Sequence, residues 1–160
     1  SVSWRQAQSG QLSLDDYWAD VARQLGLNEQ AAALFRRDFY SGDQPDAALL
    51  DYLRELRQRG HTVALLSNGS PALQGELAAF GMTDLFDVVV ASCDIGVMKP
   101  DARAYQTVLE RIGRRAHEAI FVDDLPANIA GAQAVGLHGV LYINGMDVRA
   151  ALEPLLVIAG

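Results

Sequence analysis

Residues 119–143 read AIFVDDLPANIAGAQAVGLHGVLYI, and this stretch decides the fold class. An apolar run ends in Asp123 and Asp124, a helical segment whose first turn holds Pro126 follows, and a second apolar run closes the stretch. A strand, a helix and a strand in this order predict a right-handed crossover between parallel strands. Both runs are almost continuously hydrophobic, which is typical of strands that are covered on both faces.

The same alternation extends towards the N-terminus as far as His61. Apolar runs and helical segments follow one another in TVALLS (62–67), PALQGELAAF (71–80), VVVAS (88–92) and DARAYQTVLERIG (101–113). We therefore predict an α/β domain over residues 61–160, with a Rossmann-like parallel sheet in three layers. Its last segment, DVRAALEPLLVIAG (147–160), is expected to form a short helix that is interrupted near Pro154.

Residues 1–60 lack this alternation and read as helices. Ser13 is expected to cap a helix over 14–26, which ends at Gly26. Further helices are predicted over 28–40 and from Pro45 to Arg59. The change of pattern places a boundary near residue 60.

Composition bounds the class of protein. The chain has 160 residues, of which 50% are hydrophobic and 21% charged, as in one globular domain. No apolar run approaches the roughly 18 residues of a membrane span, and the first ten residues lack the apolar core of a signal peptide, so we expect a cytoplasmic protein without a membrane partner. A formal charge of −7 argues against nucleic acid as a partner.

Polar residues follow every predicted strand. Ligands bind beyond the carboxyl ends of the strands in open parallel sheets, so these residues are candidates for one shared site. They are Ser67-Asn68-Gly69, Cys93-Asp94, Asp123-Asp124 and Asn144.

The adjacent carboxylates of Asp123 and Asp124 carry the strongest chemical signal. They repel each other, which favours a bound hard cation such as Mg²⁺ or a nearby ammonium group. Lys99 is the only lysine beside twelve arginines, and its ammonium could neutralise both a phosphate and a carboxylate. The alternatives are a solvated turn that leads into a helix and an ordinary surface lysine.

Ser67, Asn68 and Gly69 have two readings. They could form a plain turn, with Ser70 and Pro71 as the cap and first residue of the next helix. Alternatively, a hydroxyl and the following backbone amides would hold phosphate oxygens. The sequence is not a G-x-S-x-G elbow, so Ser67 is not expected to be a nucleophile.

Three segments in this order resemble motifs two, three and four of the haloacid dehalogenase superfamily. They are LLSNG (65–69), GVMKPDARAY (96–105) and IFVDDLPANIAGAQAVGLHGVLY (120–142). The chain looks most like the branch that contains the N-terminal phosphatase domain of soluble epoxide hydrolase and small bacterial sugar-phosphate phosphatases. The resemblance implies that residues 1–60 are part of a helical cap with a linker helix, and residues 61–160 the α/β core.

The resemblance also implies residue roles. Ser67, with Asn68 and Gly69 beside it, would bind the phosphoryl group, and Lys99 would hold the nucleophile and the phosphate together. A second set of residues would surround Mg²⁺: Asp124 as a direct ligand, with Asp123 and Asn128 as orienting groups around the metal. Lys99, Asp123 and Asp124 are thus the expected catalytic residues.

The family's first motif, an apolar strand that ends in the aspartate nucleophile, has no counterpart in this sequence. In the family that strand lies in the middle of the sheet, between the strands that end in Ser67 and Asp124. We therefore expect a preceding segment to carry the motif, and this chain to be inactive without it. Exposed sheet edges would also favour association into homo-oligomers.

These observations favour a Mg²⁺-dependent phosphatase that acts on a small phosphorylated metabolite through an aspartyl-phosphate intermediate. A haloacid dehalogenase shares the fold and the nucleophile, but the Asp123-Asp124 pair argues against this metal-free chemistry. A non-catalytic fragment that binds phosphate or a partner is the third reading. A response-regulator receiver would have its acid pair before its lysine in the sequence, which is the reverse of the order here.

Overall fold

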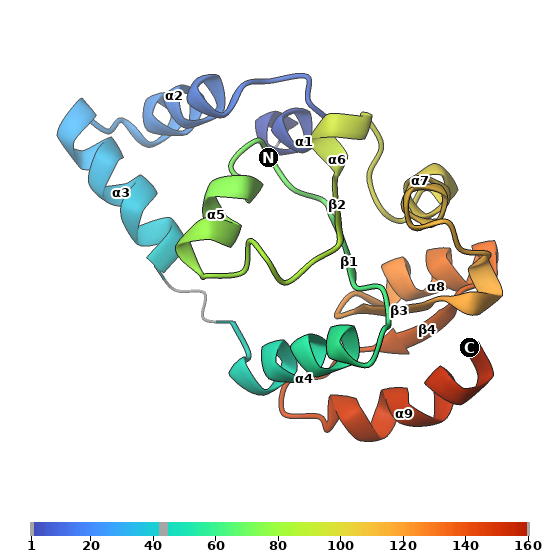
Figure 1. Ribbon diagram of the computed structural model, residues 1–160. Helices are drawn as coiled ribbons and strands as arrows, with labels where there is room; N and C mark the ends of the chain where they lie inside the picture. Colours follow the sequence, from blue (N-terminus) through green and yellow to red (C-terminus); the bar gives the residue numbers. More distant parts are fainter. Residues whose placement is uncertain (1, 42–44, 160) are drawn as a thin grey trace.

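The computed structural model describes residues 2–41 and 45–159, in which helices enclose four short strands (Figure 1). The strands are β1 (Ala64–Ser67), β2 (Val88–Ala91), β3 (Ile120–Asp123) and β4 (His138–Leu141). The helices are α1 (Val2–Gln8), α2 (Leu14–Leu25), α3 (Glu29–Ser41), α4 (Ala47–Gln58), α5 (Leu73–Ala79), α6 (Ser92–Ile95), α7 (Ala102–Ile112), the 3₁₀ helix η1 (Ala116–Glu118), α8 (Pro126–Val135) and α9 (Val148–Ala159).

Within the described residues, the strands form two parallel pairs. β1 pairs with β2 from Ala64 opposite Val88 to Ser67 opposite Ala91, and β3 pairs with β4 in the same manner. No strand of residues 2–41 or 45–159 pairs with the second edge of β1 or of β3. The predicted parallel α/β architecture is confirmed, and in the described residues the two strand pairs form separate sheets.

Helices on both faces hold the two strand pairs together. One buried cluster joins α7 and α8 to both pairs, through Leu66 of β1, Val90 of β2 and the partly buried Phe121 of β3. The opposite cluster joins α4 and α9 to β3 and β4, where Ile120 and Val122 pack. Successive residues of a strand point to opposite faces, which explains why Phe121 and its two neighbours serve different clusters. The molecule is therefore built in the three predicted layers.

The helical segment before residue 60 begins and ends largely as its capping residues predict. The Ser13 hydroxyl accepts a hydrogen bond from the Asp16 N–H, and Gly26 ends α2 with a left-handed φ of 64°. α4 begins after Asp46, whose carboxylate caps it. Helix α1 had no clear sequence signal; its Ala7 packs with aromatic side chains of α2.

Two predicted helix boundaries were wrong. α9 continues through Pro154, because the packing of Val148 and Leu152 holds the helix in place while Pro154 itself lies on the exposed side. α5 begins at Leu73 and not at Pro71. The buried Ser70 hydroxyl accepts a hydrogen bond from the Ala72 N–H at 3.3 Å, so it closes a turn before the helix.

Candidate active site

A buried ion pair lies where β3 ends. The Lys99 Nζ donates to Asp123 Oδ2 at 2.7 Å, and the two side chains are only 10% and 8% exposed. The other oxygen, Oδ1, accepts hydrogen bonds from the Leu125 N–H and from Asn128 Nδ2, each at 2.9 Å. Both oxygens of Asp123 are thus engaged by donors.

These contacts set the charge state of Asp123. Burial acts to raise its pKa, but the donors from Lys99, Leu125 and Asn128 outweigh burial and hold the pKa below its ordinary value. The carboxylate therefore stays ionised at neutral pH. The geometry joins an anion and a cation in a site from which most water is excluded, where both interact strongly.

The side chain of Asn68 holds the backbone of Lys99 in place. Asn68 Nδ2 donates to the Lys99 carbonyl at 2.9 Å, and Asn68 Oδ1 accepts from the Lys99 N–H at 2.7 Å. The peptide bond between Lys99 and Pro100 is cis. The two hydrogen bonds of the Asn68 side chain join the end of β1 to the loop before α7. The Asn68 amide thereby orients the backbone of Lys99.

Gly69 makes the turn after Ser67 tight. A Cβ at Gly69 would lie 3.1 Å from the Ser67 Oγ and 3.2 Å from Leu73 Cδ2, closer than most side chains approach. The absence of a side chain at this position lets the backbone run close to the hydroxyl of Ser67. Both residues are partly buried, at the same edge of the molecule as Asn68.

Gln8 and Ser92 support this turn, and sequence reasoning missed both. Gln8 Nε2 donates to the carbonyl of Asn68, and the Ser92 hydroxyl lies 2.6 Å from the Gln8 carbonyl and 3.3 Å from that of Gly69. These contacts join residues 60 and 84 positions apart, so no local spacing could indicate them. Ser92 is 1% exposed, and its place at the end of VVVAS was the only available signal.

Asp124 differs from its neighbour because its side chain is exposed, and no ion pair joins it to the described part of the chain. No group of three or more His, Cys, Asp or Glu side chains within residues 2–41 and 45–159 could hold a metal. Mg²⁺, however, binds through one or two carboxylates and takes its other ligands from water and phosphate. A single free carboxylate beside a fully engaged one fits that requirement.

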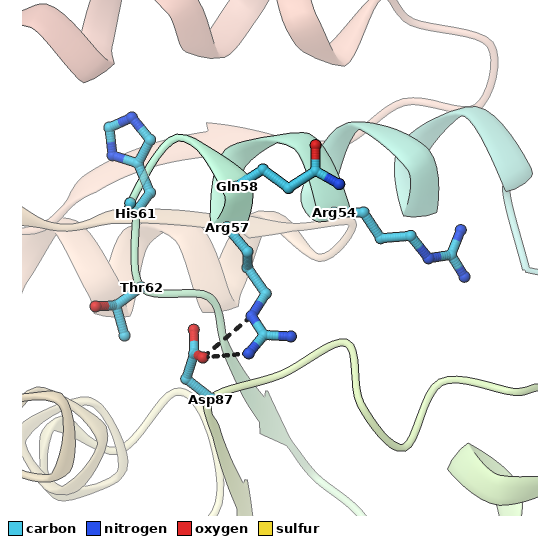
Figure 2. Close-up of a pocket in the computed structure, with 7 residues that line it drawn as sticks. Arg54, Arg57, Gln58, His61, Thr62 and Asp87 are labelled. Carbon is cyan, nitrogen blue, oxygen red and sulfur yellow. Dashed lines mark hydrogen bonds and ion pairs between the residues drawn. The ribbon is translucent and has the colours of Figure 1, made fainter.

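A hollow of the surface lies away from these residues (Figure 2). It has a volume of about 580 Å³, and Figure 2 shows Arg57 bonded to Asp87 at its wall, at 3.0 and 2.6 Å. Thr62 and Asp87 precede β1 and β2, so this hollow is at the amino ends of the strands, opposite the edge that holds Lys99 and Asp123. It contains none of the predicted site residues.

Comparison with known proteins decides the family. A sequence model of the haloacid dehalogenase-like hydrolases matches residues 27–136. The chain belongs to this family. The match includes the positions of Ser67, Lys99 and Asp123, so the resemblance found in the sequence is confirmed. Helices long and apolar enough to cross a membrane are not found in the part of this hydrolase that the structure describes.

Relatives of this family member include phosphatases and a dehalogenase. It is 37% identical over 159 residues to a sesquiterpene phosphatase of Aspergillus oryzae, covering 98% of this chain and 80% of the relative. A phosphatase of Mycobacterium tuberculosis is 35% identical, over 85% of this chain and 64% of its own. (S)-2-haloacid dehalogenase 1 of a Pseudomonas species is 31% identical, over 86% and 64%. The chain thus spans less than two thirds of the last two.

Solved structures of the family confirm the fold. A HAD-like hydrolase from Porphyromonas gingivalis is 28% identical and superposes with a TM-score of 0.76 over 94% of this chain and 77% of its own. A HAD family enzyme from Bacteroides thetaiotaomicron, in complex with magnesium and inorganic phosphate, superposes with a TM-score of 0.81 over 92% and 79% at 21% identity. The second likeness bears on the fold alone.

Proposed function

We propose that this chain forms most of a Mg²⁺-dependent phosphatase that hydrolyses the phosphate monoester of a small metabolite. The observation that supports this function best is the buried pair of Lys99 and Asp123 beside the exposed carboxylate of Asp124. Phosphoryl transfer needs positioned positive charge more than it needs covalent chemistry from the protein. The largely buried ammonium of Lys99, next to the exposed carboxylate of Asp124, meets that need.

Each residue of the proposed site has one task. The Lys99 ammonium would bind a phosphoryl oxygen and draw the attacking carboxylate towards it. The Ser67 hydroxyl and the backbone amides of the tight turn at Asn68 and Gly69 would hold the other phosphoryl oxygens. Asp124 would bind Mg²⁺, whose charge stabilises the transferring phosphoryl group. Asp123, held by Lys99 and Asn128, would orient the groups around it.

The nucleophile is proposed to be an aspartate on a further strand, which would pair with the open edges of β1 and β3. Those edges leave backbone donors and acceptors without ladder partners in the described part of the chain. The carboxylate oxygen would form a bond to phosphorus as the bond from phosphorus to the ester oxygen breaks, and that oxygen would take a proton from the second acid of an Asp-x-Asp sequence on the same strand. Water would then cleave the aspartyl phosphate and release inorganic phosphate. Because the proposed nucleophile lies on the further strand, we expect the 160-residue chain by itself to hydrolyse no substrate.

Complementation tests this proposal. The chain would be assayed with p-nitrophenyl phosphate, with and without Mg²⁺, alone and with an apolar strand ending in Asp-x-Asp fused ahead of Ser1. We expect turnover only in the fused protein with Mg²⁺, and none when the first Asp of that strand is replaced by Asn. Mg²⁺-dependent turnover by the unfused chain would show that the nucleophile lies within it.

A dehalogenase is the second candidate, because a haloacid dehalogenase is among the relatives. Displacement of a halide from carbon needs no metal, so this reading leaves the exposed carboxylate of Asp124 without a task. Release of chloride from (S)-2-chloropropionate by the fused protein in EDTA, without phosphatase activity in Mg²⁺, would favour it.

A non-catalytic role is the third candidate, favoured by the open edges of β1 and β3. Two copies of the chain could pair through these edges, which would block the added strand. Light scattering distinguishes this outcome: a monomer that binds inorganic phosphate supports the phosphatase site, whereas a stable dimer that ignores both phosphate and the added strand supports a structural role.

A further inference from the structure

Lys99 and Asp123 are connected a second time, through three further residues. Asn128 Nδ2 donates to Asp123 Oδ1 at 2.9 Å, and the Tyr105 hydroxyl donates to the Asn128 carbonyl at 2.7 Å. The rings of Tyr105 and Phe121 meet edge to face, 5.2 Å apart and at 90°. The Lys99 Nζ lies 5.4 Å from the centre of the Phe121 ring, so the contacts form a closed network.

The residues of this closed network have little conformational freedom. Tyr105 is fully buried and Asn128 is 4% exposed. A Cβ at Gly131 would lie 3.0 Å from the Tyr105 hydroxyl and 2.8 Å from Pro100, so only a glycine lets α8 approach this closely. Burial raises the pKa of Tyr105 to about 12, with a smaller effect from Asp123, so the hydroxyl keeps its proton and remains a donor.

The strand geometry places the two partners of Lys99 together. Phe121 and Asp123 are two residues apart on β3 and therefore point to the same face. The Lys99 ammonium lies over the Phe121 ring and also donates to the carboxylate at the end of the strand. The ring attracts an ammonium through its negative face and excludes water from one side of it.

We propose that Phe121 and Tyr105 are positioning residues for the lone lysine. Phe121 holds the Lys99 ammonium against Asp123, and Tyr105 fixes both the Phe121 ring and the Asn128 backbone. This placement of Lys99 does not depend on the reaction, whereas its use on a phosphoryl group rests on the proposed function.

The test uses the fact that the chain has a single lysine. Lysine carrying ¹³C at Cε and ¹⁵N at Nζ gives one side-chain signal in the whole protein. In the wild type, we expect the Cε protons to be shifted upfield by the Phe121 ring and the amine to react slowly with formaldehyde and borohydride. Phe121→Leu should move the signal towards that of free lysine and raise the rate of modification by about tenfold. Tyr105→Phe should change both in the same direction but less.

Two matched controls separate positioning from loss of packing. Phe86→Leu shortens a partly buried aromatic side chain that packs in two other clusters. Tyr142→Phe removes a hydroxyl that donates to Asp46 at 2.9 Å. Neither should move the Lys99 signal. A folded Phe121→Leu protein with an unchanged signal and rate would overturn the proposal, and so would equal effects of Phe86→Leu.

A graded series covers the case in which Phe121→Leu fails to fold. Phenylalanine with one, two or three fluorine atoms, placed at position 121 alone, keeps the shape of the ring while it weakens the negative face. The modification rate of Lys99 should rise stepwise with fluorination. A rate that is flat across folded members of the series overturns the role of the ring.

Titration with inorganic phosphate keeps this inference apart from the proposed function. A saturable change in the wild-type Lys99 signal is expected if the site binds phosphoryl groups. An upfield signal that phosphate leaves unchanged would count against the phosphatase and would leave the positioning by Phe121 standing.

Discussion

Charged side chains pair in two very different settings in this molecule. Between α4 and α9, Arg59 lies 2.6 Å from Glu153 and Arg149 pairs with Glu55, with all four side chains 37 to 50% exposed. At the end of β3, one ammonium meets one carboxylate, and both are at least 90% buried. The first set joins two helices on the surface; the second lies at the candidate site.

The difference shows how the same chemistry serves two purposes. Each member of the surface network has more than one partner: Arg59 also reaches Glu55 at 3.6 Å, and Arg149 also reaches Glu153 at 3.8 Å. Water and salt screen these pairs, so the loss of one member is tolerated. In the described residues neither member of the buried pair has a second ion-pair partner, and both side chains are at least 90% buried, so the loss of one leaves the charge of the other uncompensated.

The largest effect is expected from Lys99→Met, which breaks the buried pair. We expect the free energy of unfolding to fall by about 3 kcal/mol, because the carboxylate of Asp123 stays in a dry site without its cation. Urea denaturation measures this change. The double variant Lys99→Met with Asp123→Leu should recover much of the loss, and a double variant as unstable as the single one would mean that the unpaired charge is not the cause.

Asn68→Ala should have the next largest effect. It removes both hydrogen bonds to the backbone of Lys99 and leaves a donor and an acceptor unpaired in a partly buried loop, at a cost of about 2 kcal/mol. The exposed Asn144 offers the control, since Asn144→Ala should leave the urea midpoint unchanged. Equal midpoints for the two variants would contradict the clamp on Lys99.

Glu153→Gln, which alters the surface network, should lower the free energy of unfolding less than Lys99→Met or Asn68→Ala. Its effect should depend on pH. Arg59 is the main cause that holds the pKa of Glu153 at about 2, below its ordinary value of 4.5. The unfolded state therefore binds more protons in this range, so the stability that Glu153 contributes is complete above pH 4.5 and is lost as the pH falls towards 2. Thermal unfolding of wild type and variant should differ at about pH 6, where the Glu153 carboxylate is ionised in the folded and the unfolded state, and converge at the acid end. A constant difference would refute the assignment.

Asp124→Asn should change stability least, within about 0.5 kcal/mol, because its side chain is exposed. Its effect should instead fall on the metal: any rise of the melting temperature with MgCl₂ should be lost, and Mg²⁺-dependent turnover of the complemented protein abolished. Asp94→Asn, which alters another exposed acid beyond a strand, is the control. Wild-type turnover in Asp124→Asn would mean that the metal ligand is elsewhere.

The sequence predicted the fold where periodic hydrophobicity was strong. The runs that became β1 and β3 are short, apolar and followed by polar residues, which is how buried parallel strands appear in a sequence. Pro154 misled the prediction, since tertiary packing along α9 overrides a local helix breaker. α1 is too short to show a clear period.

The candidate site was predicted in part for a similar reason. Ser67 and Asp123 are the last residues of β1 and β3, so their place at the carboxyl ends of the strands could be predicted from the sequence pattern alone. Tyr105 and Phe121 could not be distinguished from ordinary core aromatics, because what sets them apart is the direction of a hydroxyl and a ring face. The ion pair of Lys99 with Asp123 needed the loop conformation that Asn68 imposes.

In the described residues β1 and β3 belong to separate two-stranded sheets, which are connected through side-chain packing in the outer layers. Backbone ladders have a fixed repeat, whereas packed helices tolerate small sliding movements. If the proposed further strand pairs with both β1 and β3, its backbone would fix a spacing that side-chain packing alone leaves adjustable. The chain would then suit a split-protein switch, in which addition of a short strand controls assembly of the proposed site.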